Sequence, residues 1–96
     1  MTDHLYIIAY DIADARRWRR VFKIMKGYGE WLQLSIFQCR LTAKQYVELT
    51  IALSTTIKAE EDHVLFLNLG PADSVRPKVE SLGKKFNPLG REAIII

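Results

Sequence analysis

Hydrophobic positions along the chain occur in short blocks whose spacing separates strands from helices. Residues 5–10 are continuously apolar and rich in aromatic and β-branched side chains, which favours a strand buried on both faces. Residues 30–41 alternate between apolar and polar side chains until the pattern breaks near Leu34 and Ser35, which predicts a bulged strand or two short strands. Residues 63–69 are nearly all apolar, and we expect them to form a central strand.

Two other segments have the spacing of amphipathic helices. Asp14 is a favourable N-cap residue, and the helix behind it is predicted to end at Gly27 and Gly29. The apolar stripe of this helix consists of Trp18, Val21, Phe22 and Met25. The second helix begins at a capping box made by Thr42 and Gln45 and extends to about residue 56. Its stripe consists of Tyr46, Leu49, Leu53 and Ile57, widened by Val47 and Ile51.

The C-terminal third has weaker patterns. Residues 71–77 are predicted to form a loop with a short helical turn, and residues 78–86 a fourth, edge strand. Residues 91–96 end in three isoleucines, which would promote aggregation if they were left exposed. This segment forms a final strand either in its own sheet or in the sheet of a partner subunit, and its pattern fits both.

The order of these elements predicts an α+β fold. A ferredoxin-like (βαββαβ) single domain with both helices on one face of the sheet fits the count. Residues 1–86 would form its core, and residues 91–96 would add a C-terminal strand. A chain of 96 residues buries only a modest core, which a homodimer would extend.

Positive charge is concentrated on the first helix. The net charge is +3, and 6 of the 14 Lys and Arg residues lie between positions 16 and 26. Arg16, Arg19, Arg20 and Lys23 lie opposite the apolar stripe, and Arg17 and Lys26 flank it. Because no acidic residue relieves the repulsion within this helix, the pattern favours an anionic partner such as nucleic acid over plain solvation.

Other features restrict the compartment. The single cysteine, Cys39, excludes an internal disulfide and is typical of a cytoplasmic protein. No apolar run approaches the ~20 residues that span a bilayer, and the N-terminal residues lack the pattern of a signal peptide. We therefore expect a cytoplasmic location with no membrane partner.

Asp11 is the candidate for chemistry, because it puts a carboxylate directly after an apolar strand. A carboxylate there could bind a metal ion, or it could shape the turn that leads to Asp14. His4 and His63 have no acidic or cysteine partner at ligand spacing, and Cys39 fits a small buried residue. Neither a glycine-rich phosphate loop nor a zinc motif is present in the sequence.

Together these motifs resemble a known family. Tyr10, Asp11 and Ile12 end a hydrophobic strand, a basic helix closes at Tyr28 and Gly29, and residues 33–39 read QLSIFQC. In this order and spacing they resemble the small CRISPR-associated adaptation protein, or endoribonuclease, that is the partner of the CRISPR spacer integrase. The resemblance covers residues 5–69.

The resemblance implies a ferredoxin-like homodimer that assembles with the CRISPR spacer integrase and holds duplex DNA. It also implies a Mg²⁺-dependent, or Mn²⁺-dependent, endonuclease acting on single-stranded RNA or duplex DNA, with one metal ion held by Asp11 from each subunit. The family pattern assigns supporting positions to Tyr10, Ser35 and Phe37. It assigns nucleic-acid binding to the basic helix residues Arg16, Arg17, Arg19, Arg20 and Lys23. One departure is Trp31, where the family commonly has Arg, and we expect this indole to pack rather than stack on a base.

Two alternatives to a nuclease follow from the same residues. The protein could be a non-catalytic scaffold that holds spacer DNA for the integrase, or a toxin-like RNA interferase. The variant Asp11→Asn distinguishes the scaffold from a nuclease. If the protein is a nuclease, the variant should lose cleavage; if it is a scaffold, spacer integration should be intact.

Overall fold

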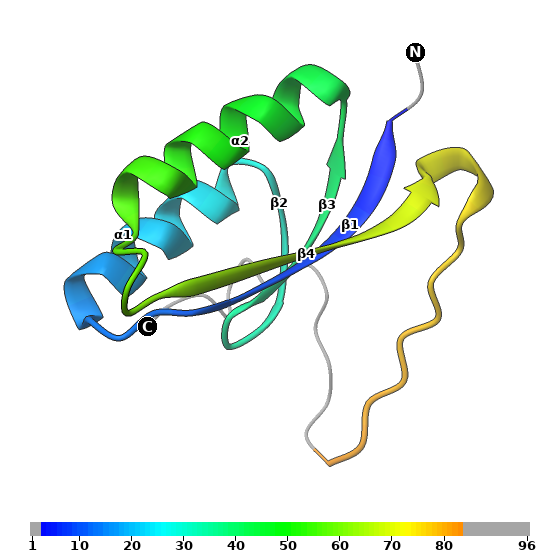
Figure 1. Ribbon diagram of the computed structural model, residues 1–96. Coiled ribbons are helices and arrows are strands. Elements are labelled where there is room, and N and C mark those ends of the chain that lie inside the picture. The colour runs from blue at the N-terminus through cyan, green and yellow to red at the C-terminus, as the bar shows by residue number, and fades with distance from the viewer. Residues whose placement is uncertain (1–2, 84–96) are drawn as a thin grey trace.

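The computed structural model describes residues 3–83 of the chain, which form one four-stranded antiparallel sheet with two helices on one side (Figure 1). The elements, in chain order, are β1 (His4–Asp11), α1 (Ala15–Lys26), β2 (Gly29–Gln33), β3 (Ile36–Leu41), α2 (Ala43–Thr56), β4 (His63–Pro71) and a 3-10 turn, η1 (Ala72–Ser74). The strand order is β2-β3-β1-β4. This confirms the ferredoxin-like βαββαβ prediction.

The hydrophobic core lies between the sheet and the helices. In the central strand β1, Ile8 is fully buried opposite Phe37 of β3 and Phe66 of β4. The helices contribute the predicted stripes, with fully buried positions at Val21, Met25 and Leu49 and nearly full burial at Leu53. Because successive residues of a strand face opposite sides, β1 contributes the alternate positions Tyr6, Ile8 and Tyr10 to this core.

The helix ends follow the sequence signals. The Asp14 carboxylate caps α1 by accepting a hydrogen bond from the Arg17 backbone N–H at 3.0 Å. α2 begins with the predicted reciprocal capping box between Thr42 and Gln45. The break near Leu34 is also confirmed: Leu34 has a positive φ of 41° in the turn that separates β2 from β3.

Several sequence expectations were wrong. Within residues 3–83 the apolar strand β4 is an edge strand rather than a central one. Val47 and Ile51 point outward, with 54% and 58% of their surface exposed. The described part of the predicted strand at 78–86, which is residues 78–83, has no strand structure. The rest of that segment and the predicted strand at 91–96 lie outside the described residues.

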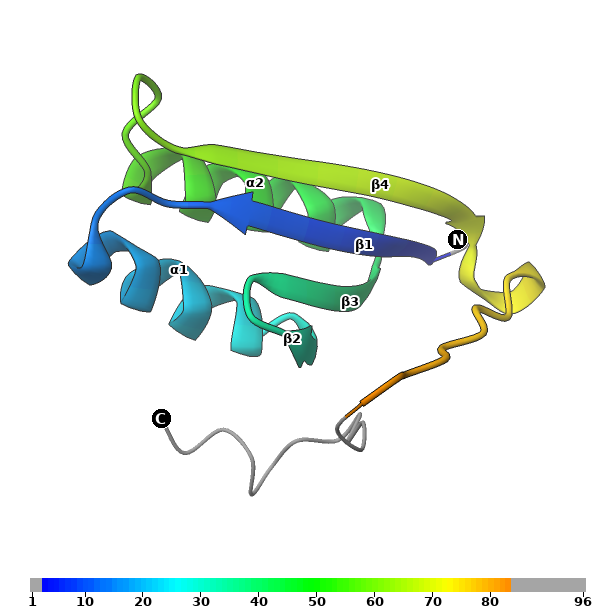
Figure 2. The same ribbon diagram turned by 90° about the horizontal axis from the view of Figure 1, so that it is seen from below.

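The second face of the sheet carries no helix within residues 3–83 (Figure 2). Ile7 and Ala9 of β1 are therefore only half-buried. The prediction that this strand is buried on both faces was wrong for these two positions. Leu65, Leu67 and Leu69 of β4 are 48%, 43% and 38% exposed. One face of the sheet is thus filled by helices, and the β1–β4 part of the other face is apolar and carries no helix within residues 3–83. We call this second side the uncovered face.

Candidate functional site

Asp11 is the last residue of β1 and projects at the end of the uncovered face. It is an odd-numbered position, like Ile7 and Ala9, and it is exposed. Its neighbour in the adjacent strand is His63, the first residue of β4, which is also exposed. Within residues 3–83 the Asp11 carboxylate has no hydrogen bond or ion pair with another side chain or amide. The reading of Asp11 as a turn-shaping residue therefore has no contact to support it.

The turn behind Asp11 is instead shaped by Asp62, which no motif in the sequence marks as a site residue. The Asp62 side chain is 0% exposed and accepts the backbone N–H of Ala13 at 2.9 Å and of Lys58 at 2.8 Å. Arg17 donates to both carboxylate oxygens, from Nε at 2.7 Å and from Nη2 at 3.2 Å. These four hydrogen bonds connect the end of β1, the start of α1 and the loop before β4.

This network perturbs both charged groups. Hydrogen bonding from the Arg17 guanidinium, assisted by the two backbone N–H groups, holds the pKa of Asp62 well below its usual range. The same pair raises the pKa of Arg17 above its ordinary value, with a further contribution from Glu61, whose Oε1 lies 3.0 Å from Nη2. Both groups therefore stay charged throughout the neutral range. No local sequence signal pointed to this pair, because its members are 45 residues apart.

The predicted nucleic-acid-binding residues divide into two groups. Arg17 is half-buried and holds Asp62 and Glu61. The other four, all on the outer side of α1, are exposed: Arg16, Arg19, Arg20 and Lys23. None of these four forms a salt bridge within residues 3–83, although Arg16 lies close enough to Asp14 to lower the pKa of that carboxyl. Their charges are therefore available to an external anion.

The predicted supporting residues lie on the core side of the sheet rather than beside Asp11. Ser35 receives the backbone N–H of Tyr10 on its carbonyl at 3.1 Å and the Trp18 indole N–H on its hydroxyl at 2.9 Å. Phe37 is fully buried, with its ring 6.3 Å from that of Tyr10. These contacts join the β2–β3 turn to the end of β1 and to α1.

Packing also accounts for Trp31. Its ring forms an edge-to-face contact with Phe22, with centroids 6.3 Å apart, and its indole N–H donates to the Leu34 carbonyl at 2.9 Å. The expectation of packing over base stacking is supported by these contacts. The indole bond also holds the backbone of Leu34 in its left-handed conformation.

Two other groups that could carry chemistry are held neutral. Burial raises the pKa of the Tyr10 phenol well above its ordinary value, only partly offset by Ser35. Burial also raises the pKa of the Cys39 thiol to about 12, and its side chain is fully buried. Neither a phenolate base nor a thiolate nucleophile forms from these two groups at neutral pH.

The donor set for a metal ion is small. Within residues 3–83, no three His, Cys, Asp or Glu side chains form a cluster that could hold a metal ion. Asp11 and His63, its neighbour in the β1–β4 register, are two residues of these types, one fewer than a cluster of three. Mg²⁺ binds through one or two carboxylates and keeps most of its waters, so the residues fit this ion if two copies of the chain contribute.

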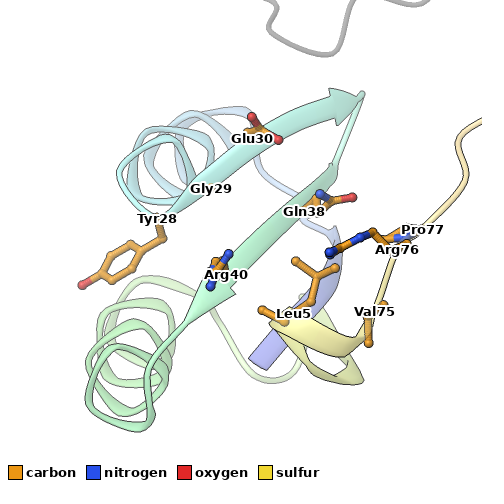
Figure 3. A pocket seen from close by; sticks show the side chains of 10 residues that line it. Leu5, Tyr28, Gly29, Glu30, Gln38, Arg40, Val75, Arg76 and Pro77 are labelled. Carbon is orange, nitrogen blue, oxygen red and sulfur yellow. The ribbon is translucent and has the colours of Figure 1, made fainter. Parts of the chain in front are cut away.

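A separate hollow lies at the other end of the sheet, beside β2 and β3 (Figure 3). Its lining includes Glu30, Gln38 and Arg76, together with Arg40. The Arg40 guanidinium is held by Asp3 at 3.1 Å and Asp73 at 3.0 Å. Because Asp11 lies at the opposite end of β1, this hollow is not part of the candidate site.

The fold and site define a ferredoxin-like α+β protein with an exposed strand-end carboxylate next to a basic helix. The family model described as CRISPR associated protein Cas2 matches residues 4–76. The chain belongs to the Cas2 family. In the described residues, no helix is both long and apolar enough to cross a membrane.

Relatives match over nearly the whole chain. The CRISPR-associated endoribonuclease Cas2 of Geobacter sulfurreducens is 53% identical over 98% of this chain and 99% of the relative. The CRISPR-associated endoribonuclease Cas2 1 of Rhodospirillum rubrum is 56% identical over 98% of this chain and 92% of the relative. The crystal structure of Streptococcus pyogenes Cas2 at pH 6.5 matches with a TM-score of 0.72 and 28% identity, over 82% of this chain and 99% of that one.

Proposed function

We propose that this protein is a CRISPR-associated endoribonuclease in which Asp11 is the catalytic residue. The observation that carries the proposal is the Asp11 carboxylate itself, exposed at a strand end and without a partner in the described residues. The relatives that are named endoribonucleases support the reaction class. The compartment we propose is the cytoplasm, which the single unpaired cysteine favours.

The active unit in this proposal is a homodimer formed through the uncovered face of the sheet. Leu65 and Leu67 lie on that face next to Ile7 and Ala9, and an apolar surface of this kind is typical of an interface. A two-fold contact brings the same residues together from both copies. Two Asp11 carboxylates at one interface would supply what a single chain lacks, a second ligand for the metal ion.

The metal in this proposal is Mg²⁺ or Mn²⁺, held by Asp11 of each subunit. A bound divalent ion would lower the pKa of a water ligand and offset charge on the phosphate. The chain's own residues do the rest. Arg16, Arg19, Arg20 and Lys23 bind phosphates of the strand, and the neutral Tyr10 anchors the end of β1 through packing instead of exchanging a proton.

A second candidate function is a duplex-binding scaffold that works with the spacer integrase. It is favoured by the separation of the basic residues of α1, on the helix side of the sheet, from Asp11, on the uncovered side. With this arrangement duplex DNA can bind without reaching Asp11. The two functions are compatible, because both use the basic residues of α1 and only cleavage requires Asp11.

The test is a paired assay on purified protein. Single-stranded RNA and duplex DNA are incubated with and without Mg²⁺ or Mn²⁺, and cleavage and binding are measured on the same samples. We expect metal-dependent RNA cleavage by the wild type and none by Asp11→Asn, with unchanged binding. The matched control is Asp73→Asn, the same chemical change at the far end of the sheet, in a side chain that is 81% exposed.

Cleavage that survives in Asp11→Asn would refute the catalytic assignment. Binding without cleavage in the wild type would leave the scaffold as the function, and integration assays with the integrase would then follow.

A further inference from the structure

We propose that Asp62 is the positioning residue for Asp11, and that Arg17 is its partner rather than a phosphate ligand. The proposal rests on the proposed function, in which Asp11 binds the metal ion. Asp62 does not touch the reacting atoms. It acts through the turn at residues 12–14, which leads away from Asp11.

The contacts that carry this proposal hold the turn on both sides. On one side, the Asp62 carboxylate accepts the Ala13 backbone N–H, two residues after Asp11. On the other side, Asp14 accepts the Arg17 backbone N–H, while the Arg17 guanidinium returns to Asp62. The short segment between β1 and α1 is therefore fixed by one carboxylate and one guanidinium that bind each other.

Asp62 also controls the strand next to Asp11. It directly precedes His63, which lies opposite Asp11 in the β1–β4 register. The Lys58 backbone N–H donates to the same carboxylate, which folds the loop before β4 against the turn. One buried side chain thus sets the position of both strand ends at the site.

The chemistry of the pair suits a positioning role better than a role in binding. A carboxylate that is 0% exposed and holds four hydrogen bonds has no lone pair directed at a ligand. Arg17 makes a two-point contact that only the planar guanidinium provides. Removing such outer partners of a metal ligand typically costs ~10–100-fold in metal affinity or activity.

The experiment compares Asp62→Asn and Arg17→Lys with the wild type and with Leu53→Ala. Leu53 is a buried residue of α2, so this variant loses stability without touching the turn. Two quantities are measured below the melting temperature of every variant: the Kd for Mn²⁺ in the absence of substrate, and hydrogen exchange of the backbone amides of residues 12–14. Cleavage is then measured at saturating Mn²⁺ to separate kcat from KM.

We expect Asp62→Asn to weaken Mn²⁺ binding ~10–100-fold and to lower kcat more than it raises KM. Its turn amides should exchange faster, whereas those of Leu53→Ala should not. Arg17→Lys should give a smaller effect in the same direction, because lysine keeps the charge and loses the two-point contact. As a phosphate ligand, Arg17 would instead change KM with little effect on the Kd for Mn²⁺.

Two results would overturn the proposal. One is hydrogen exchange of the turn amides in Asp62→Asn at the wild-type rate. The other is a loss of Mn²⁺ affinity in Leu53→Ala as large as the loss in Asp62→Asn. Failure of the proposed function has a different signature, because Mn²⁺ would then bind equally well to the wild type and to Asp11→Asn. In that case the exchange rates alone would still decide whether Asp62 holds the turn.

Discussion

Two aspartates at the same end of the sheet have opposite surroundings. Asp11, at the end of β1, is exposed, and its carboxylate has no hydrogen bond or ion pair within residues 3–83. Asp62, just before β4, is fully buried in its side chain and is bound by Arg17 and two backbone N–H groups. The same chemical group is available to a ligand in one place and fully used by the protein in the other.

The difference shows how environment assigns a role to a carboxylate. A buried carboxylate is tolerated only when its hydrogen bonds and charge are satisfied, so Asp62 is a structural anion. An exposed carboxylate with no partner contributes little to folding and remains free for chemistry. We therefore expect substitution of Asp11 to affect activity without affecting stability, and substitution of Asp62 to affect stability and, through the turn, activity.

The largest expected effect on stability is that of Asp62→Asn. An amide cannot replace the charge facing Arg17, so the variant leaves a guanidinium with a weaker partner and should melt at a clearly lower temperature. Asp11→Asn should change the free energy of unfolding by no more than about 0.5 kcal/mol, as for other exposed positions. Thermal unfolding followed by circular dichroism measures both. Equal melting temperatures for the two variants would contradict the comparison.

Acid should remove the stability that Asp62 provides. Because the folded pKa of Asp62 is lowered, its contribution is complete above the unfolded pKa of about 3.9 and is lost as the pH falls toward the folded value. The melting temperature of the wild type should therefore fall more steeply below pH 4 than that of Asp62→Asn. A difference between the two that stays constant from pH 6 to pH 2 would be evidence against the ion pair.

The smallest expected effect concerns the outer side of α1. Arg19→Gln with Arg20→Gln should reduce the salt dependence of RNA binding, because each phosphate contact on a single strand contributes about 0.7 to the slope of log K against log salt. We expect a loss of about 1.4 for the pair, with no change in melting temperature. Lys44→Gln on α2 is the control and should leave the slope unchanged, since α2 carries no basic cluster.

Local signals in the sequence were sufficient for most of the fold. The cap at Asp14, the box at Thr42 and Gln45, and the break at Leu34 depend on neighbouring residues, and each was confirmed. The order of the strands was not accessible in the same way. The apolar run at residues 63–69 indicated a central strand, but within residues 3–83 it lies at the edge, and its leucines are exposed on the uncovered face.

The candidate site was predicted in part. Asp11 was a candidate from its place directly after an apolar strand, and the family resemblance, not the local pattern, favoured a metal-binding role over a turn-shaping one. Asp62 was not a candidate, because it lies in an acidic link and its partners come from the turn after β1 and from Arg17, 45 residues away. Arg17 itself was grouped with the other basic residues of α1, since helical spacing alone does not distinguish a half-buried guanidinium from an exposed one.

The most direct test of this account is the rate of RNA cleavage by Asp11→Asn at saturating Mg²⁺ or Mn²⁺, measured beside Asp73→Asn. We predict no detectable metal-dependent cleavage by Asp11→Asn, with folding and RNA binding equal to those of the wild type, and full activity of Asp73→Asn. Cleavage by Asp11→Asn at the wild-type rate would contradict the central claim that the exposed carboxylate at the end of β1 is the catalytic group.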